Sequence, residues 1–200
     1  MKALVLIDVQ NDFMPGGALA VPGGDEIVPI INKLQEKFDL VIATQDWHPA
    51  GHASFASTHS KKTFEVIDLN GIDQVMWPDH CIQGSDGAAF HKDLKLDKIE
   101  AIFRKGTNPE IDSYSGFYDN AHLKSTGLSG YLKEKEVNEL YFAGLACDFC
   151  VAFSVKDALA EGFKSFLIED ATRAIDAEGF KKAKAEIEAN GGKILNSDEV

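Results

Sequence analysis

The sequence predicts a three-layer α/β/α fold with a mostly parallel central sheet of about six strands. Short apolar runs typical of strands alternate with segments of helical periodicity along the whole chain. The first run, Lys2–Val9, is almost continuously apolar, as expected of a parallel strand buried on both faces. The chain has no repeat, low-complexity tract or linker-like stretch, and 200 residues suit one core, so we expect a single domain over residues 1–200.

The remaining elements follow in order. Ile27, Ile31 and Leu34 recur at helical spacing and predict a helix over Asp25–Phe38, and Leu40–Thr44 is the second strand. Residues 45–95 lack long periodic segments and are rich in His, Trp, Pro, Gly and Asp, so we expect a loop-rich metal and substrate insertion there. The later part alternates again, with strands expected at 99–104, 138–143, 164–169 and 193–195, and helices at 128–135, 150–161 and 178–189.

Composition excludes several classes of protein. The net charge of −12 disfavours nucleic-acid binding, because phosphate backbones repel an acidic surface. No apolar run approaches the roughly 20 residues of a membrane span, and Asp8 interrupts the N-terminal run too early for a signal peptide. Three cysteines without framework spacing indicate free thiols and a reducing compartment, so we expect a cytoplasmic protein. The sequence leaves a homo-oligomer open.

Four reactive residues are predicted to meet at one edge of the sheet. Asp8 ends the first strand, Asp46 follows the second, Lys105 ends the third, and Cys150 follows the fourth. Open parallel sheets bind ligands outside the carboxyl ends of their strands. We therefore expect the functional site at this edge.

Asp8, Lys105 and Cys150 suit cysteine-dependent hydrolysis. A thiol in the first turn of a helix meets unpaired N–H groups, which favour the nucleophilic thiolate and can receive an oxyanion. Asp8 can take the thiol proton and return it to a leaving amine, and Lys105 can stabilise the anions. Taken singly, each residue also has an ordinary explanation: a loop hydrogen bond for Asp8, a solvated side chain for Lys105 and a small buried hydrophobe for Cys150.

A second group of side chains offers oxygen and imidazole ligands to a divalent metal. Asp46 and His48 form an Asp-x-His pair, and His80 follows in Trp77-Pro-Asp-His80-Cys81. His52 is either a fourth ligand or a residue that supports the ligands. We expect surface histidines at 59 and 91 and a buried thiol at Cys81. Three loop aromatics, Phe13, Trp77 and Tyr114, are either satellite core or a slot for a flat ring.

These motifs resemble the nicotinamidase family of the isochorismatase-like cysteine hydrolases, from residue 1 to about 195. The resemblance rests on Asp8-Val-Gln-Asn-Asp-Phe13, Asp46-Trp-His48-Pro, Trp77-Pro-Asp-His80-Cys81, Lys105-Gly with Asp112-Ser-Tyr-Ser-Gly-Phe117, and Gly144-Leu-Ala-Cys-Asp-Phe-Cys150-Val.

The resemblance implies specific roles for these residues. It implies a catalytic triad of Asp8, Lys105 and Cys150, a metal held by Asp46, His48 and His80, and a ring pocket lined by Phe13, Trp77 and Tyr114. Zinc is the first expectation for the metal, with iron or manganese as alternatives. The backbone amides of Ala146 and Cys150 would form the oxyanion hole, beside a cis peptide bond between Leu145 and Ala146. Phe149 departs from the histidine that other members often carry before the nucleophile.

The resemblance also implies the activity: hydrolysis of nicotinamide to nicotinate and ammonia through a thioester on Cys150, in the salvage of pyridine nucleotides, with pyrazinamide as a further substrate. One alternative is another hydrolase of the superfamily that acts on a carbamoyl or ureido substrate and generally lacks the metal residues. The alternative from another class is a non-catalytic flavodoxin-like ligand-binding module, which would not need a thiol at position 150.

Overall fold

The computed structural model describes residues 1–200 and contains a six-stranded parallel sheet, which confirms the predicted fold class. The strands lie in the order β5-β2-β1-β6-β7-β8. Their bounds are Lys2–Ile7 for β1, Leu40–Asp46 for β2, Ile99–Lys105 for β5, Glu139–Gly144 for β6, Lys164–Thr172 for β7 and Lys193–Leu195 for β8. Every pair of neighbouring strands is parallel, so all six carboxyl ends point the same way.

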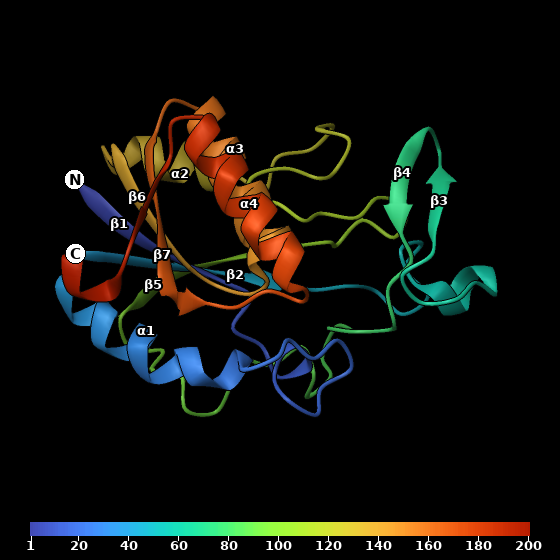
Figure 1. Ribbon diagram of the computed structural model, residues 1–200. Helices are drawn as coiled ribbons and strands as arrows, with labels where there is room; N and C mark the ends of the chain where they lie inside the picture. The colour runs from blue at the N-terminus through green and yellow to red at the C-terminus, as the bar shows by residue number, and fades with distance from the viewer.

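Helices cover both faces of the sheet. Figure 1 shows α1 (Val28–Leu34) on one face and α2 (Leu128–Glu134), α3 (Ala152–Ala160) and α4 (Ala177–Ala189) on the other. Two separate clusters of buried apolar residues fill the spaces between the layers. The central strand β1 contributes to both: Leu4 and Leu6 pack on the α1 side, whereas Ala3, Val5 and Ile7 pack on the other side. This strand is therefore buried on both faces, as its continuous apolar sequence predicts.

The helix expected over Asp25–Phe38 is shorter and broken into three pieces. Only α1 is an α-helix, and 3-10 turns at Gly24–Ile27 and Gln35–Lys37 flank it. Pro29 stands in the first turn of α1, where its missing N–H costs nothing. The fixed φ of proline helps to set the start of the helix. Apolar spacing alone does not distinguish α-helical from 3-10 turns. The predicted length of the helix is therefore wrong only at its two ends.

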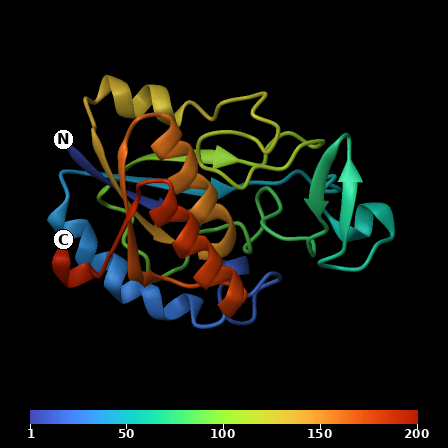
Figure 2. The same ribbon diagram turned by 45° about the horizontal axis from the view of Figure 1, so that its top comes forward.

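The segment between β2 and β5 contains a two-stranded antiparallel hairpin that the sequence analysis did not anticipate. Its strands are β3 (Val66–Leu69) and β4 (Ile72–Val75), joined by Asn70 and Gly71 with φ of 56° and 85°. Asn-Gly is the strongest short sequence signal for such a turn, and it was present in the sequence. Figures 1 and 2 show the hairpin beyond the carboxyl ends of the strands, apart from the central sheet. A 3-10 turn at Ala56–His59 precedes it.

Several strands differ slightly from their predicted ends. The second strand runs to Asp46, so this carboxylate is on the strand and pairs in register with Lys105 of β5. The fifth predicted strand extends three residues further, to Thr172. No helix in the structure has both the length and the apolarity that a membrane crossing requires.

Candidate active site

Lys105 joins the elements of the site at the carboxyl end of the sheet. Its ammonium group lies 2.8 Å from Asp8 Oδ2 and 3.0 Å from Asp46 Oδ1. It also donates a hydrogen bond to the carbonyl of Ser113 at 3.0 Å and lies 3.5 Å from Cys150 Sγ. The side chain is completely buried, so the solvated lysine that is the ordinary expectation for this residue is excluded. One cation therefore touches two carboxylates and the thiol.

Strand register explains why Lys105 and Asp46 meet. They are paired neighbours on β5 and β2, so their side chains leave the sheet on the same face. Burial disfavours the charge on each group, but the opposite charges outweigh it. The pKa of Lys105 is consequently well above its usual value, and the pKa of Asp46 is held well below its usual value by His48 and Lys105. Both groups are charged at neutral pH.

Asp8 is placed immediately after β1, with φ of 48°. Thr44 of β2 fixes its carboxyl group: the Thr44 hydroxyl donates to Asp8 Oδ1 at 2.6 Å and accepts from the Asp8 N–H at 3.2 Å. Oδ2 faces only the Lys105 ammonium. Burial raises the pKa of Asp8 despite the opposing effect of Lys105. A carboxylate with a raised pKa is a stronger base, and a base is what the proposed proton transfer requires.

The thiol of Cys150 is only 8% exposed, and this burial opposes the thiolate that the sequence predicts. Burial raises the pKa of Cys150 well above the usual value, although Lys105 works in the opposite direction. A helix start was expected to favour the thiolate. The residue instead lies in a π-helical turn, Cys147–Val151, that precedes α3. Burial therefore favours the neutral thiol, whereas the Lys105 ammonium 3.5 Å away favours the thiolate.

The backbone before the thiol has the conformation that the family resemblance implied. The Leu145-Ala146 peptide bond is cis. Gly144, with φ of 117°, lets the chain pass Ile7, because a Cβ at this position would lie 2.0 Å from the Ile7 carbonyl oxygen. Ala146 and Cys150 both line the same small cavity, where their amides remain our candidates for the oxyanion hole.

Asp46, His48 and His80 bring their ligand atoms together, all within 4.8 Å of one another. Asp46 Oδ2 lies 3.0 Å from His48 Nε2 and 3.3 Å from His80 Nε2. The other ring nitrogens are already engaged: Nδ1 of His48 faces the Gly106 carbonyl at 3.0 Å, and Nδ1 of His80 faces the Pro78 carbonyl at 2.8 Å. Because a carbonyl only accepts, Nδ1 carries the proton, and a neutral ring then presents the lone pair of Nε2.

This donor set fits a divalent cation. Ligands about 2.1 Å from a tetrahedral zinc ion lie about 3.4 Å from each other, close to the observed separations. The absence of a side chain at Gly106 leaves room for the His48 ring, because a Cβ at this position would lie 2.4 Å from His48 Cε1. Two imidazole nitrogens and one carboxylate oxygen suit a borderline divalent ion and leave open coordination positions.

His52 lies beside this cluster, with its ring centroid 4.4 Å from that of His48. Both its nitrogens have other partners, the Ser54 hydroxyl at 2.8 Å and the Asn108 carbonyl at 2.7 Å. This arrangement favours the supporting role over the fourth-ligand role. His59 and His91 are half-buried and outside the cluster, and Cys81 is a fully buried thiol whose pKa is raised by burial.

The three aromatics line one small chamber with the nucleophile. Phe13, Trp77 and Tyr114 share this inner cavity with Cys150, Ala146, Asp46 and His80. The Trp77 and Tyr114 rings meet edge to face at 6.0 Å, and Trp77 Nε1 donates to the Tyr114 hydroxyl at 3.2 Å. The structure thus brings the predicted triad, metal ligands and ring pocket to one place.

Sequence reasoning assigned no role to several residues that organise this chamber. Gln10 bridges β1 to β2, because its amide bonds both the N–H and the carbonyl of Asp46. Asp112 lines the cavity and accepts from Gln74, which also donates to the Tyr114 hydroxyl. Gln10 and Asp112 both lie in the motifs quoted for the family resemblance, which was the available signal. Gln74 lies in the unanticipated hairpin and had no such signal.

Comparisons with known proteins agree with this site. The family model "Isochorismatase domain" matches residues 2–199. Nicotinamidase of Escherichia coli is 47% identical over 191 residues, which is 94% of this chain and 90% of that protein. A solved structure of a nicotinamidase/pyrazinamidase from Acinetobacter baumanii has a TM-score of 0.97 and 46% identity, with 99% of this chain and 97% of that chain covered. A pyrazinamidase from Pyrococcus horikoshii, solved in complex with zinc, has a TM-score of 0.81 and 37% identity, with 98% of each chain covered. The chain therefore belongs to the isochorismatase family.

Proposed function

We propose that this enzyme hydrolyses nicotinamide to nicotinate and ammonia, and that it also hydrolyses pyrazinamide. The observation that carries the proposal is the inner cavity, where Cys150, two metal-ligand candidates and a ring of aromatic side chains face the same space. The named activities of the Escherichia coli, Acinetobacter and Pyrococcus relatives support it. An amide carbonyl and a flat heteroaromatic ring are the two substrate features that these groups can recognise together.

In the proposed reaction, the Cys150 sulfur attacks the carboxamide carbon, and the thiol proton passes to the Asp8 carboxylate. The carbonyl oxygen becomes an oxyanion that the amides of Ala146 and Cys150 stabilise. Asp8 then returns the proton to the nitrogen, the C–N bond breaks, and ammonia leaves a thioester on Cys150. Water, deprotonated by Asp8, attacks the thioester and releases nicotinate, and the thiol is restored. Throughout, Lys105 stabilises the negative charge that moves between Asp8 and the sulfur.

Asp46, His48 and His80 are the residues that would hold a divalent cation, and we propose zinc. When bound, such an ion supplies a Lewis-acid position suited to a pyridine nitrogen. Phe13, Trp77 and Tyr114 offer the ring apolar contact but cannot by themselves distinguish pyridine from benzene. Discrimination between these rings therefore has to come from the polar side of the cavity.

The experiment compares kcat/KM for nicotinamide, pyrazinamide and benzamide with metal content verified. Benzamide has the same shape and scissile bond but lacks the ring nitrogen. A site built around a polar contact rejects the analogue lacking it by up to roughly 10⁴-fold, and replacement water softens this, so we expect about 10²-fold or more. Equal rates for benzamide and nicotinamide would refute the proposed specificity. Absence of ammonia from all three amides, with Cys150 still reactive, would favour a carbamoyl or ureido substrate.

A further inference from the structure

The chamber around the nucleophile is too small for its ligand in this conformation. The inner cavity has a volume of about 20 Å³. A single water molecule needs roughly 10–15 Å³, so the cavity holds about one water and no aromatic ring. A ring can reach Cys150 only after part of the cavity wall has moved.

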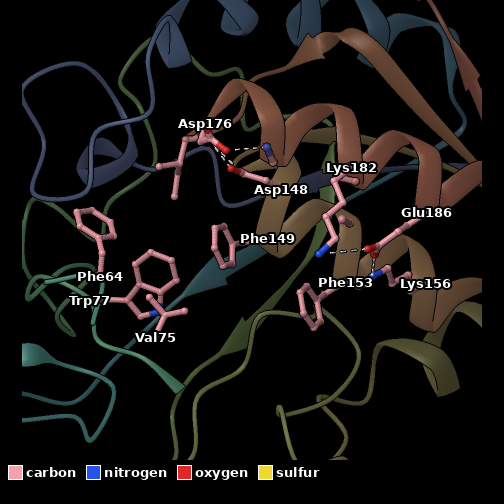
Figure 3. Close-up of a pocket in the computed structure, with 14 residues that line it drawn as sticks. Phe64, Val75, Trp77, Asp148, Phe149, Phe153, Lys156, Asp176, Lys182 and Glu186 are labelled. Carbon is pink, nitrogen blue, oxygen red and sulfur yellow. Dashed lines mark hydrogen bonds and ion pairs between the residues drawn. The ribbon is translucent and has the colours of Figure 1, made fainter. Parts of the chain in front are cut away.

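A much larger cavity lies directly outside this wall. The outer cavity has a volume of about 540 Å³, which is within the usual range of small-molecule pockets. Figure 3 shows Phe64, Trp77, Phe149 and Phe153 around it, with the ion pairs of Glu186 on another side. Its walls are largely apolar, which suits the passage of a flat ring.

The two cavities share three lining residues, Trp77, Phe149 and Ile175, and we call this shared set the partition. Other surface cavities offer poorer routes. The cavity at the hairpin shares only Asp112 with the inner cavity, and the mostly polar one near Lys105 and Asn108 shares none of its residues. Because the outer cavity shares the most lining residues with the inner one, we take the partition as the route from solvent to the thiol.

Phe149 is the half-buried aromatic member of the partition. Trp77 is 3% exposed and tied to Tyr114 by a hydrogen bond. Ile175 and Phe149 are both half-buried, and their backbone N–H groups donate to Asp148 Oδ1 and to the Ala146 carbonyl, each at 3.1 Å. Phe149 is half-buried, its ring has no polar anchor, and it meets Trp77 and Tyr114 only edge to face, at 4.8 and 5.6 Å. The outer cavity beside it gives the ring space to turn into.

We propose that the outer cavity is the entry chamber for the substrate, and that the Phe149 ring is the gate that turns aside to admit it. The identity of the substrate, a flat heteroaromatic amide, rests on the function proposed above. The gate also selects by size, because only a ring that passes between Trp77 and the displaced Phe149 reaches Cys150.

The test measures access to Cys150 directly and needs no turnover. Wild type, Phe149→Ala and the more conservative Phe149→Leu are treated with a small alkylating reagent, iodoacetamide, and a bulky one, N-phenylmaleimide. Peptide mass spectrometry gives the rate of modification at Cys150. The readout is the ratio of the bulky-reagent rate to the small-reagent rate, because a change in the thiol pKa affects both rates and cancels in the ratio.

A minor open state is commonly populated at about 0.1–10%, so removing the gate should raise the bulky-reagent rate about tenfold or more. We expect the ratio to rise by this factor in Phe149→Ala and by less in Phe149→Leu. Phe64→Ala is the matched control, because Phe64 lines the outer cavity but not the inner one and is 55% exposed. Its ratio should stay at the wild-type value.

Two results would overturn the gate. One is an unchanged ratio in Phe149→Leu and in a Phe149→Ala protein whose circular dichroism matches the wild type. The other is an equal rise of the ratio in Phe64→Ala, which would show that the walls of the outer cavity, and not Phe149, limit access to Cys150. If Phe149→Ala does not fold, the Phe149→Leu ratio alone decides. Failure of nicotinamide hydrolysis would refute the proposed function but would leave the labelling ratios, and hence the gate, as a separate result.

Discussion

Replacing Lys105 with methionine should destabilise the protein strongly at neutral pH. Methionine preserves much of the length of the lysine side chain but removes the charge that lies 2.8 Å from Asp8 and 3.0 Å from Asp46. All three side chains are buried, so neither carboxylate can recover its hydration. Removing one partner from a buried ion pair typically costs about 3–5 kcal/mol. We expect Lys105→Met to lower the free energy of unfolding by about this amount near pH 8.

The difference in the free energy of unfolding between wild type and Lys105→Met, here called the deficit, should become smaller as the pH falls. Burial raises the pKa of Asp8 above its ordinary value of 3.8, and Lys105 partly offsets this rise, so the pKa should climb further in Lys105→Met. A group with a raised pKa in the folded state binds a proton more tightly there than in the unfolded chain. Its stabilising contribution is therefore complete below the unfolded pKa and is lost as the pH rises through the folded pKa. Protonation of Asp8 at lower pH removes the uncompensated charge.

The assay is urea denaturation of chelator-treated wild type and Lys105→Met between about pH 5 and pH 8, the range in which most folded proteins are near their maximal stability. The Asp8→Asn/Lys105→Met double variant identifies the group, because it should be less destabilised near pH 8 than Lys105→Met and should lose the extra pH dependence. A deficit below about 1 kcal/mol near pH 8 would match an exposed ion pair rather than a buried one and would refute the reasoning. So would a deficit that grows toward low pH.

Three further predictions concern the reaction and the metal. Cys150→Ala should fold normally but form no thioester. Acid-quenched wild type should show a substrate adduct on the Cys150 peptide by mass spectrometry. An adduct on Cys147, a thiol whose pKa burial raises to about 12, would contradict the assignment. Elemental analysis should show loss of bound metal in alanine variants of each candidate ligand and a smaller loss in His52→Ala; full retention in all three would exclude the site at Asp46, His48 and His80. Gly106→Ala should weaken metal binding sharply, because the new Cβ would lie 2.4 Å from His48 Cε1 and would displace the ring. Metal–ligand distances tolerate deviations of only about 0.2 Å. Unchanged affinity in a metal titration would show that His48 is not a ligand.

Local periodicity and short motifs were sufficient to predict the layers of the fold. Apolar runs identified all six strands of the sheet. The central strand β1 is buried on both faces and is almost continuously apolar, whereas the edge strand β5 alternates between less and more exposed positions. The alternation of strands and helices then implied a parallel sheet, and hence the edge at which Asp8, Asp46, Lys105 and Cys150 would gather. The Asn70-Gly71 hairpin was predictable by the same local rules and was overlooked.

The chemical state of the site depended on tertiary contacts that no local pattern contains. Lys105 is a buried cation rather than a surface one because β5 pairs with β2 and places it beside Asp46. Burial likewise raises the pKa of Cys150, although its position before a helix favoured the thiolate. Phe149 meets Trp77 edge to face only because the long segment between β2 and β5 returns to the carboxyl end of the sheet. Sequence determined which residues reach the edge of the sheet, whereas their charges and access depend on distances and solvent exclusion set by segments far apart in the chain.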